Sequence, residues 1–250
     1  MTVDKKIVLI TGANKGVGYE TAKALLLTSA DYHVLLASRD PARGAEALES
    51  LQREPTIQGT AAAMQLDVTD DASIQAAAQQ VKERYGRLDV LINNAGISNK
   101  SSNPGEQVRA NMATNVVGPV VVTDAFEPLL KAATDPRIIF VTSSLGSLGH
   151  ASNPNSIYYS TKASYPYDYY RASKAALNMI MVEYGKRNPE IKVFGGDPGW
   201  LATDLANKEQ MQKLGAPHPE VGAREIVRIV LGERDEDVGK VVGKYGVQIW

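Results

Sequence analysis

The chain has 250 residues, of which 44% are hydrophobic, a formal net charge of −1, three histidines and no cysteine. This length and hydrophobic content exclude a disordered chain and suit a domain with a sizeable core. The near-neutral charge argues against nucleic-acid and membrane partners, the lack of cysteine excludes disulfides, and the scattered histidines predict no metal site.

The chain begins with an expected strand at residues 7–10, an apolar and β-branched run close to Met1. With so few residues before the first expected strand, we expect no signal peptide. No apolar run approaches the roughly 18 residues of a membrane span. We therefore expect a cytoplasmic protein.

Apolar runs that predict strands alternate with segments of helical periodicity. The expected strands cover residues 7–10, 33–37, 62–66, 89–92, 137–141 and 191–194, with a closing strand within 238–247. The expected helices cover residues 19–28, 41–51 (with Ala45, Leu48 and Leu51 on one face), 72–85, about 106–130 with an interruption at Gly118-Pro119, 170–186 and 222–231. This order predicts one α/β domain over residues 1–250, a doubly wound parallel sheet of the Rossmann type with about seven strands and helices on both faces. Ligands bind such sheets beyond the carboxyl ends of the strands.

The turn Thr11–Gly18 joins the first expected strand to the first expected helix. Gly12 would permit the tight turn, Gly16 would let the backbone approach a pyrophosphate, and Gly18 would let the helix lie close on the sheet. The helix N-terminus would present free N–H groups to the phosphates. The turn predicts a dinucleotide site whose candidate residues are Gly12, Asn14, Lys15, Gly16, Val17 and Gly18.

The ends of the second and third strands carry candidate contacts for the adenosine half of a dinucleotide. Ser38 and Arg39 stand where an acidic residue would favour NAD, and a guanidinium suits the 2′-phosphate of NADP. Lys15 would add a second cation, although both cations could equally be solvated surface charges. Asp67, which Val68 follows, could bond the adenine amino group or be the cap of the next helix. We expect NADP(H) as the cofactor.

Tyr170 and Lys174 lie four residues apart in an expected helix, so they share one face. Free tyrosine has a pKa of about 10, and a neighbouring ammonium lowers the pKa and makes the phenol a better proton donor. Tyr158 and Lys162 form a second pair with this spacing, but Pro166 would stop a helix there within two turns. Tyr170 is therefore the expected acid.

These motifs, in their order along the chain, resemble the short-chain dehydrogenases/reductases in their single-domain form. The matching positions are Thr11–Gly18, Asn93-Asn94-Ala95-Gly96, Asn115, Ser143, Tyr170 with Lys174, and Pro198-Gly199 with Thr203. The resemblance covers nearly the whole chain. Asn14-Lys15 and Ser38-Arg39 make it most similar to NADPH-dependent carbonyl reductases within that family.

The resemblance implies a role for each matching residue. Tyr170 would protonate the carbonyl oxygen, Lys174 would lower the pKa of Tyr170 and bind the nicotinamide ribose, and Ser143 would bond the substrate oxygen. Asn115 would hold a water in the proton path to Lys174. Further cofactor contacts are implied for Asn94, Ala95, Gly96, Pro198, Gly199 and Thr203.

Two segments depart from the family pattern or carry its variable part. After the fifth expected strand, Ser143 rather than Ser144 fits the serine position of the family, with Gly146 three residues later. An insertion at about residues 147–168, which departs from the family pattern, precedes Tyr170. The insertion is rich in tyrosine, and we expect it to line the substrate pocket, the alternative being a surface loop. It leaves open whether the chain is a homo-oligomer or a monomer. Residues 200–219 are expected to form a substrate lid, or else to pack on the core.

The expected function is the reduction of a small-molecule ketone or aldehyde by NADPH. One alternative is an alcohol dehydrogenase that works mainly in oxidation with the same residues. Another is a non-catalytic NADP(H)-binding sensor, because fold does not determine function. The presence of Asn115, Ser143, Tyr170 and Lys174 argues against a sensor, which needs no proton relay.

Overall fold

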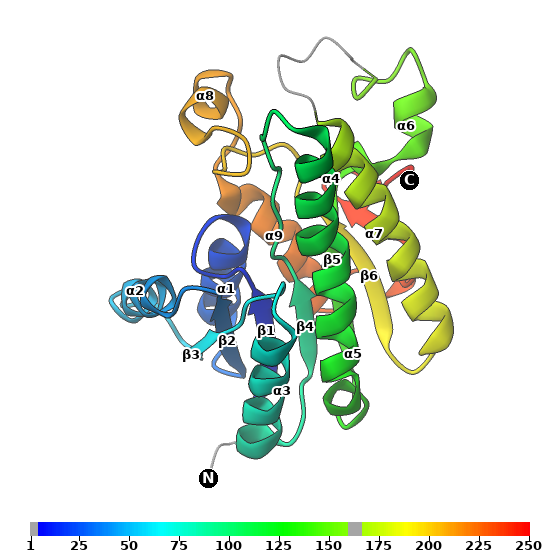
Figure 1. Ribbon diagram of the computed structural model, residues 1–250. Helices are drawn as coiled ribbons and strands as arrows, with labels where there is room; N and C mark the ends of the chain where they lie inside the picture. Colours follow the sequence, from blue (N-terminus) through cyan, green and yellow to red (C-terminus); the bar gives the residue numbers. More distant parts are fainter. Residues whose placement is uncertain (1–4, 160–166) are drawn as a thin grey trace.

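Figure 1 shows the computed structural model of the chain, a central sheet with helices on both faces; residues 5–159 and 167–250 are described. The sheet has eight strands in the order β3-β2-β1-β4-β5-β6-β7-β8, and every neighbouring pair is parallel except β7 and β8. This order confirms the expected Rossmann-type sheet, with one strand more than expected. The strands are β1 Lys6–Thr11, β2 Tyr32–Ser38, β3 Thr60–Gln65, β4 Val90–Asn93, β5 Arg137–Val141, β6 Lys192–Asp197, β7 Val241–Gly243 and β8 Gly246–Val247.

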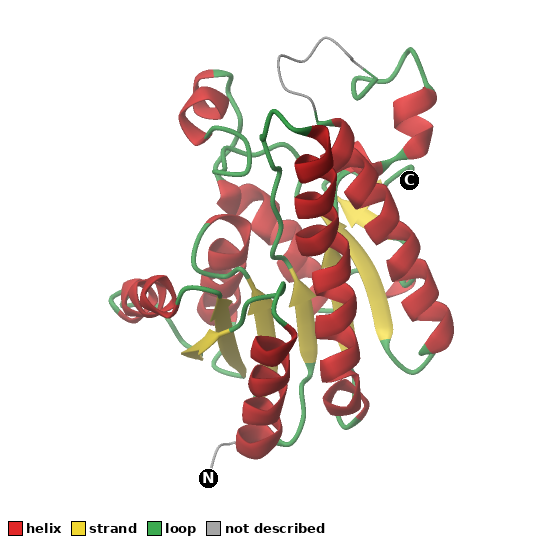
Figure 2. Cartoon of the chain, in the orientation of Figure 1, coloured by secondary structure: helices red, strands yellow, loops and turns green. Residues whose placement is uncertain are grey.

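The helices form a layer on each face of the sheet, as Figure 2 shows in red around the yellow strands. Buried side chains of α3, α5 and α7 pack on one face, and those of α1, α2 and α9 pack on the other. The α-helices are α1 Gly16–Thr28, α2 Pro41–Gln52, α3 Asp71–Tyr85, α4 Pro104–Met112, α5 Gly118–Lys131, α6 Leu148–Ser152, α7 Asp168–Arg187, α8 Lys208–Lys213 and α9 Pro219–Val230. In residues 5–159 and 167–250, no helix is both long and apolar enough to cross a membrane.

The strands are buried on both faces because their side chains alternate. Ile7 and Leu9 of β1 belong to the core beneath α3, α5 and α7, whereas Val8 and Ile10 belong to the core beneath α1, α2 and α9. An apolar run without polar interruptions is therefore the pattern that a central parallel strand requires. The two cores hold the sheet rigid, so that loops at its carboxyl edge start from well-defined positions.

The long expected helix differs from expectation at its middle. The chain does not break at Gly118-Pro119, and a π-helical turn, Ala113–Val117, joins α4 to α5. Gly118 is required there because a Cβ would lie 2.8 Å from the carbonyl oxygen of Val68. Pro119 has no N–H, so the carbonyl of Asn115 lacks the donor that an α-helix would place four residues on.

Two further expectations need correction. The closing strand within residues 238–247 is two short strands, β7 and β8, which pair antiparallel around a turn in which Gly246 has a φ of +94°. The buried face of α2 consists of Gly44, Ala47 and Leu51, whereas Ala45 is exposed. The helix packs on its i, i+3, i+7 row, and small residues there let α2 approach the sheet closely.

Candidate active site

A cleft of about 1120 Å³ lies beyond the carboxyl ends of strands β1 to β6. In Figure 1 these ends point upward, toward the region flanked by α8 on one side and α6 on the other. The cleft is lined by every candidate site residue except Gly18 and Asn115. The structure thus gathers residues that follow six strands, together with Tyr170 and Lys174 of α7, at the edge of the sheet where ligands of such folds bind.

The three glycines of the first turn differ in their surroundings. Gly12 and Gly16 have φ values of +64° and +61°, in the region that favours glycine. A Cβ on Gly16 would have no atom within 4 Å, so the space before the N-terminus of α1 is open. A Cβ on Gly18 would lie 2.4 Å from Nδ2 of Asn94, so Gly18 makes room for the loop after β4 rather than for the sheet itself.

Hydrogen bonds join the glycine turn to the loop after β4. The amide of Asn94 donates to the carbonyls of Thr11 at 2.8 Å and Gly12 at 3.2 Å. The hydroxyl of Thr11 accepts from the backbone N–H groups of Asn94 at 3.0 Å and Ala95 at 2.9 Å. Thr11 begins the expected motif, but its role as a tie between two loops was not predicted, because it depends on the neighbouring strand.

Cations and polar groups gather where β2 ends. The hydroxyl of Ser38 is buried and donates to the carbonyl of Asp40, while Arg39 is exposed and forms no ion pair within residues 5–159 and 167–250. Arg43, in the first turn of α2, also lines the cleft, although its place in the sequence does not predict this. Lys15 forms an ion pair with Asp204 at 2.7 Å, so it is joined to the segment after β6.

The carboxylate of Asp67 organises its own turn and does not cap α3. Its Oδ1 accepts from the backbone N–H of Thr69 at 2.9 Å and from the Thr69 hydroxyl at 2.7 Å. The cap of α3 is Asp70, which accepts from the N–H of Ala72. Asp67 and Val68 both line the cleft. The capping alternative for Asp67 is therefore wrong, whereas its contact with a ligand stays a prediction.

The two adjacent serines after β5 have different partners. Ser144 is buried, and its backbone N–H and its hydroxyl both donate to Oδ2 of Asp197. Ser143 is partly exposed in the cleft; its hydroxyl accepts from the N–H of Leu145 at 3.2 Å and is close enough to the phenol of Tyr170 to lower the pKa of Tyr170. Ser143 is thus the serine that faces the space beside Tyr170, which agrees with the expected choice.

Tyr170 and Lys174 lie on the first turns of α7 and face the end of β5. Tyr170 is 7% exposed and Lys174 is 4% exposed. The ammonium of Lys174 lies 5.7 Å from the centre of the Tyr170 ring and donates to the carbonyl of Val141 at 2.7 Å. The pair therefore shares a face, as its spacing predicts, and opens into the cleft.

Burial dominates the proton affinities of this pair. Burial and then the charge of Asp197 raise the pKa of Tyr170, while its bond with Ser143 lowers the pKa. Burial lowers the pKa of Lys174 to about 8, and the charge of Asp197 opposes that change. The lowering of the Tyr170 pKa by Lys174, which the resemblance implies, stays a prediction.

Asn115 lies behind the cleft wall in the π-helical turn. Its amide accepts from the N–H of Ile97 at 2.8 Å and donates to the Ile97 carbonyl and to the Ser173 hydroxyl, each at 2.9 Å. A Cβ on Gly96 would lie 3.4 Å from Asn115 Oδ1 and 3.7 Å from Lys174 Nζ. Asn115 is therefore next to Lys174, but its side chain is fully occupied.

The described part of the insertion lies beside Tyr170. Arg171 donates to the carbonyl of Leu145 at 3.1 Å and to the carbonyl of Tyr158 at 2.9 Å, which ties the insertion to the loop after β5. Tyr158 lies outside any helix and lines the cleft together with Tyr167. Residues 160–166, which include Lys162, Tyr165 and Pro166, lie outside the described residues.

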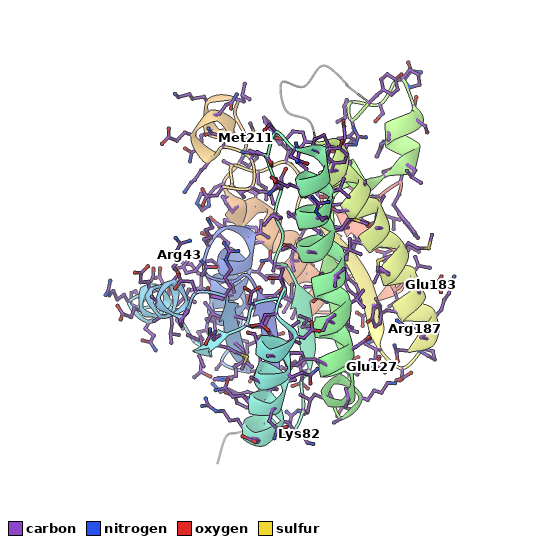
Figure 3. All side chains as sticks on the ribbon, viewed as in Figure 1. Arg43, Lys82, Glu127, Glu183, Arg187 and Met211 are labelled. Carbon is purple, nitrogen blue, oxygen red and sulfur yellow. The ribbon has the colours of Figure 1, made fainter. Side chains whose placement is uncertain are left out.

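The segment of residues 200–219 forms a small unit across the cleft. Met211 of α8, labelled in Figure 3, packs with Ala202 and Ala216 in a separate apolar cluster. The ion pair of Lys15 with Asp204 and a bond from Lys100 to the carbonyl of Ala206 join this unit to the rest of the site. Trp200 lines the cleft and is 54% exposed.

Known proteins match this chain along nearly its whole length. The short chain dehydrogenase family model matches residues 6–214. The short-chain dehydrogenase/reductase tropE of Talaromyces stipitatus is 43% identical over 262 residues, which cover 97% of each chain. The (+)-neomenthol dehydrogenase of Arabidopsis thaliana is 32% identical over 89% of this chain and 90% of its own. The NADPH-bound carbonyl reductase from chicken fatty liver superposes with a TM-score of 0.77, at 27% identity, over 99% of this chain and 100% of that chain. The chain therefore belongs to the short-chain dehydrogenase/reductase family, as its motifs predict.

Proposed function

We propose that this oxidoreductase reduces a ketone or aldehyde to an alcohol with NADPH, and that Tyr170 is the proton donor. The observation that carries the proposal is the meeting of Ser143, Tyr170 and Lys174 in the cleft into which the glycine turn opens. A sensor would not need a hydroxyl pair and a buried lysine at this place. The same residues could run the reaction in the direction of oxidation, which the reduction of NADP⁺ in the presence of alcohols would measure.

The residues of the cleft fit a nicotinamide dinucleotide. The open space before Gly16 lets phosphate oxygens reach the N–H groups at the start of α1. Asn94, Ala95 and Gly96 would hold the nicotinamide ribose with Lys174, and Pro198, Gly199 and Thr203 would border the nicotinamide. When bound, the cofactor supplies the hydride, and the protein supplies alignment and the proton.

The charges at the end of β2 support NADPH over NADH. Arg39 and Arg43 both line the cleft, and Arg39 is exposed, so its guanidinium could bind a 2′-phosphate. Arg43 would take part if the phosphate competes with Asp40, whose carboxylate lies 3.4 Å from its Nε. Lys15 would take part only if the phosphate competes with Asp204 for its ammonium. The similar carbonyl reductase from chicken fatty liver is NADPH-bound, which adds support.

Ser143 would orient the substrate by donating a hydrogen bond to its carbonyl oxygen, on which negative charge develops. The oxygen would also accept a hydrogen bond from Tyr170, which gives up its proton as the charge forms. Lys174 lies beside the Tyr170 ring and would return a proton to it. Because Pro119 leaves the Asn115 carbonyl without a helical donor, that carbonyl could hold the water that resupplies Lys174.

The insertion at about 147–168 and the segment 200–219 would form the walls and the lid of the substrate pocket in the single domain 1–250. Tyr158 and Tyr167 line the cleft from one side and Trp200 from the other. Such walls suit an apolar carbonyl compound. A cytoplasmic location stays a prediction.

The proposal is tested by cofactor oxidation with a panel of ketones and aldehydes, comparing NADPH with NADH. Tyr170→Phe should lower kcat by roughly 10²- to 10⁴-fold, the usual contribution of a general acid, and should leave NADPH binding intact. Tyr158→Phe, which removes the hydroxyl of a cleft tyrosine outside any helix, is the comparison and should lower kcat far less than Tyr170→Phe, because Tyr158 would only line the pocket. Activity that survives Tyr170→Phe and disappears in Tyr158→Phe would contradict the choice of acid. Tight NADPH binding without turnover of any carbonyl or alcohol would favour the sensor.

A further inference from the structure

Asp197 is a buried carboxylate beside the site that the proposed reaction does not use directly. It ends β6 and is 5% exposed. Its Oδ2 accepts from the backbone N–H of Ser144 at 2.9 Å and from the Ser144 hydroxyl, and its Oδ1 accepts from the N–H of Gly199 at 2.9 Å. No lysine or arginine in the described parts of the chain forms an ion pair with it. Neutral donors thus hold the carboxylate, and its charge acts on the surroundings.

The three hydrogen bonds join two loops of the site. Ser144 follows Ser143 in the loop after β5, and Gly199 belongs to the turn after β6 that lines the cleft. Gly243 of β7 lies behind the carboxylate, where a Cβ would be 3.4 Å from the Cβ of Asp197. With a glycine behind it and a loop on either side, Asp197 sets the spacing between Ser143 and the wall formed by Gly199.

The same carboxylate lies at the end of the sheet that Lys174 faces. Lys174 bonds the carbonyl of Val141, and Val141 pairs with Gly196, the residue before Asp197. The turn Ser144–Gly146 lies directly against α7, since a Cβ on Gly146 would be 2.7 Å from the carbonyl carbon of Lys174. A negative charge in this position stabilises the ammonium form of Lys174 and destabilises the phenolate form of Tyr170.

The charges around the pair come from few elements. After burial, which raises the pKa of Tyr170 and lowers that of Lys174, the next cause for both is the charge of Asp197, which raises both. Tyr167, before α7, also raises the pKa of Tyr170. The other ionisable groups that line this side of the cleft are Tyr158, Asp168, Arg171, Asp204 and His218.

We propose that Asp197 is a positioning residue whose carboxylate holds the loops of Ser143 and Gly199 together and whose negative charge sets the pH range in which Tyr170 and Lys174 transfer a proton. This inference rests on the proposed reductase function. Neutralising Asp197 makes the phenol and the ammonium release their protons at lower pH. As the pH rises, reduction, which needs the proton on Tyr170, is then lost at a lower pH than in the wild type. Oxidation of an alcohol, which needs Tyr170 without its proton, begins at a lower pH than in the wild type.

The test compares pH profiles of kcat/KM for NADPH-dependent reduction in the wild type, Asp197→Asn and Ser144→Ala. Asp197→Asn keeps the shape of the side chain, and the alkaline limb should move down by about one pH unit. Ser144→Ala removes one hydrogen bond but keeps the charge, so its alkaline limb should stay with that of the wild type. If the alkaline limb of a folded Asp197→Asn variant coincides with that of the wild type, or if the limb shifts equally in both variants, the proposed role of the charge is wrong.

A second measurement needs no substrate. In protein labelled with ¹³C-lysine, the Lys174 side-chain resonance, assigned by its loss in Lys174→Met, should titrate about one unit lower in Asp197→Asn than in the wild type. A wild type that reduces no carbonyl compound would contradict the proposed reductase function. The titration of Lys174 would still test the effect of the Asp197 charge, because it needs no reaction. Asp197→Ser is a second neutral variant should Asp197→Asn not fold. If neither neutral variant folds, the role of Asp197 is structural and the proposal is wrong.

Discussion

Replacing Lys174 by methionine should stabilise the protein at neutral pH while it abolishes the proposed reaction. Lys174 is 4% exposed, and burial is the main cause that lowers its pKa from 10.5 to about 8. A shift of this size corresponds to about 3 kcal/mol of destabilisation at pH 7, where the lysine is charged in both states. Loss of the hydrogen bond to Val141 offsets about 1–2 kcal/mol of that gain. The nucleotide-free Lys174→Met variant should therefore be more stable by about 1–2 kcal/mol at pH 7.

The sign of the pH dependence follows from the direction of the shift. The folded state binds its proton on Lys174 more weakly than the unfolded state does, so the penalty is complete below pH 8. The penalty disappears as the pH rises from about 8 to 10.5, because the buried lysine is then neutral while the unfolded lysine still holds its proton, and the change ends once the unfolded lysine also loses that proton. The stability advantage of Lys174→Met should shrink by about 2 kcal/mol between pH 7 and about pH 9.5.

Urea denaturation of both proteins at the two pH values measures this difference directly. Lys186→Met, on the same helix but with a side chain 66% exposed, is the control and should change stability by no more than about 0.5 kcal/mol at either pH. A Lys174→Met variant that is less stable than the wild type at pH 7, by an amount that does not change with pH, would refute the reasoning.

Two further predictions concern the stability of the fold. Gly18→Ala would place a Cβ 2.4 Å from Nδ2 of Asn94 and should lower the free energy of unfolding by about 3 kcal/mol in urea. In Gly16→Ala the added Cβ meets no atom, so the positive φ alone should lower the free energy of unfolding by about 1–2 kcal/mol. This variant should mainly weaken NADPH binding. Equal losses of unfolding free energy in Gly16→Ala and Gly18→Ala would count against this reasoning. The Arg137 hydrogen bond is the main cause that lowers the pKa of Asp235 to about 2, and Asp235 is partly exposed, so Asp235→Asn should cost about 1–2 kcal/mol at pH 7. That difference should vanish as the pH falls from about 4 to 2 in acid unfolding, and a difference that persists at pH 2 would contradict the assignment.

The elements that the sequence predicts best are those with a strong local pattern. The strand Arg137–Val141 is predicted with its observed bounds, because five residues buried on both faces leave an uninterrupted apolar run after the arginine. The π-helical turn at Ala113–Val117 could not be predicted, since its periodicity differs from that of an α-helix by one residue in a single turn. The sequence predicts a single strand where the hairpin of β7 and β8 lies, because valines occur in both halves.

The candidate site depends more on contacts between distant parts of the chain. Motif order places Ser143 and Tyr170 at strand and helix ends, but the partners of Ser144 separate the two serines, and Asp197 is 53 residues away. The pairing of Lys15 with Asp204 spans 189 residues and has no counterpart in any local pattern. Such contacts arise only when parallel strands bring their carboxyl ends together.

The sequence by itself determined the family, the order of the strands and the types of residue at their ends, because hydrophobic periodicity and turn chemistry are local properties. Only the tertiary structure decided how those residues titrate and what they touch. The motif predicts a role for Lys174 but not its pKa, which burial lowers and the charge of Asp197 raises. Desolvation and the field of nearby charges depend on distances through space, which the order of residues along the chain does not specify.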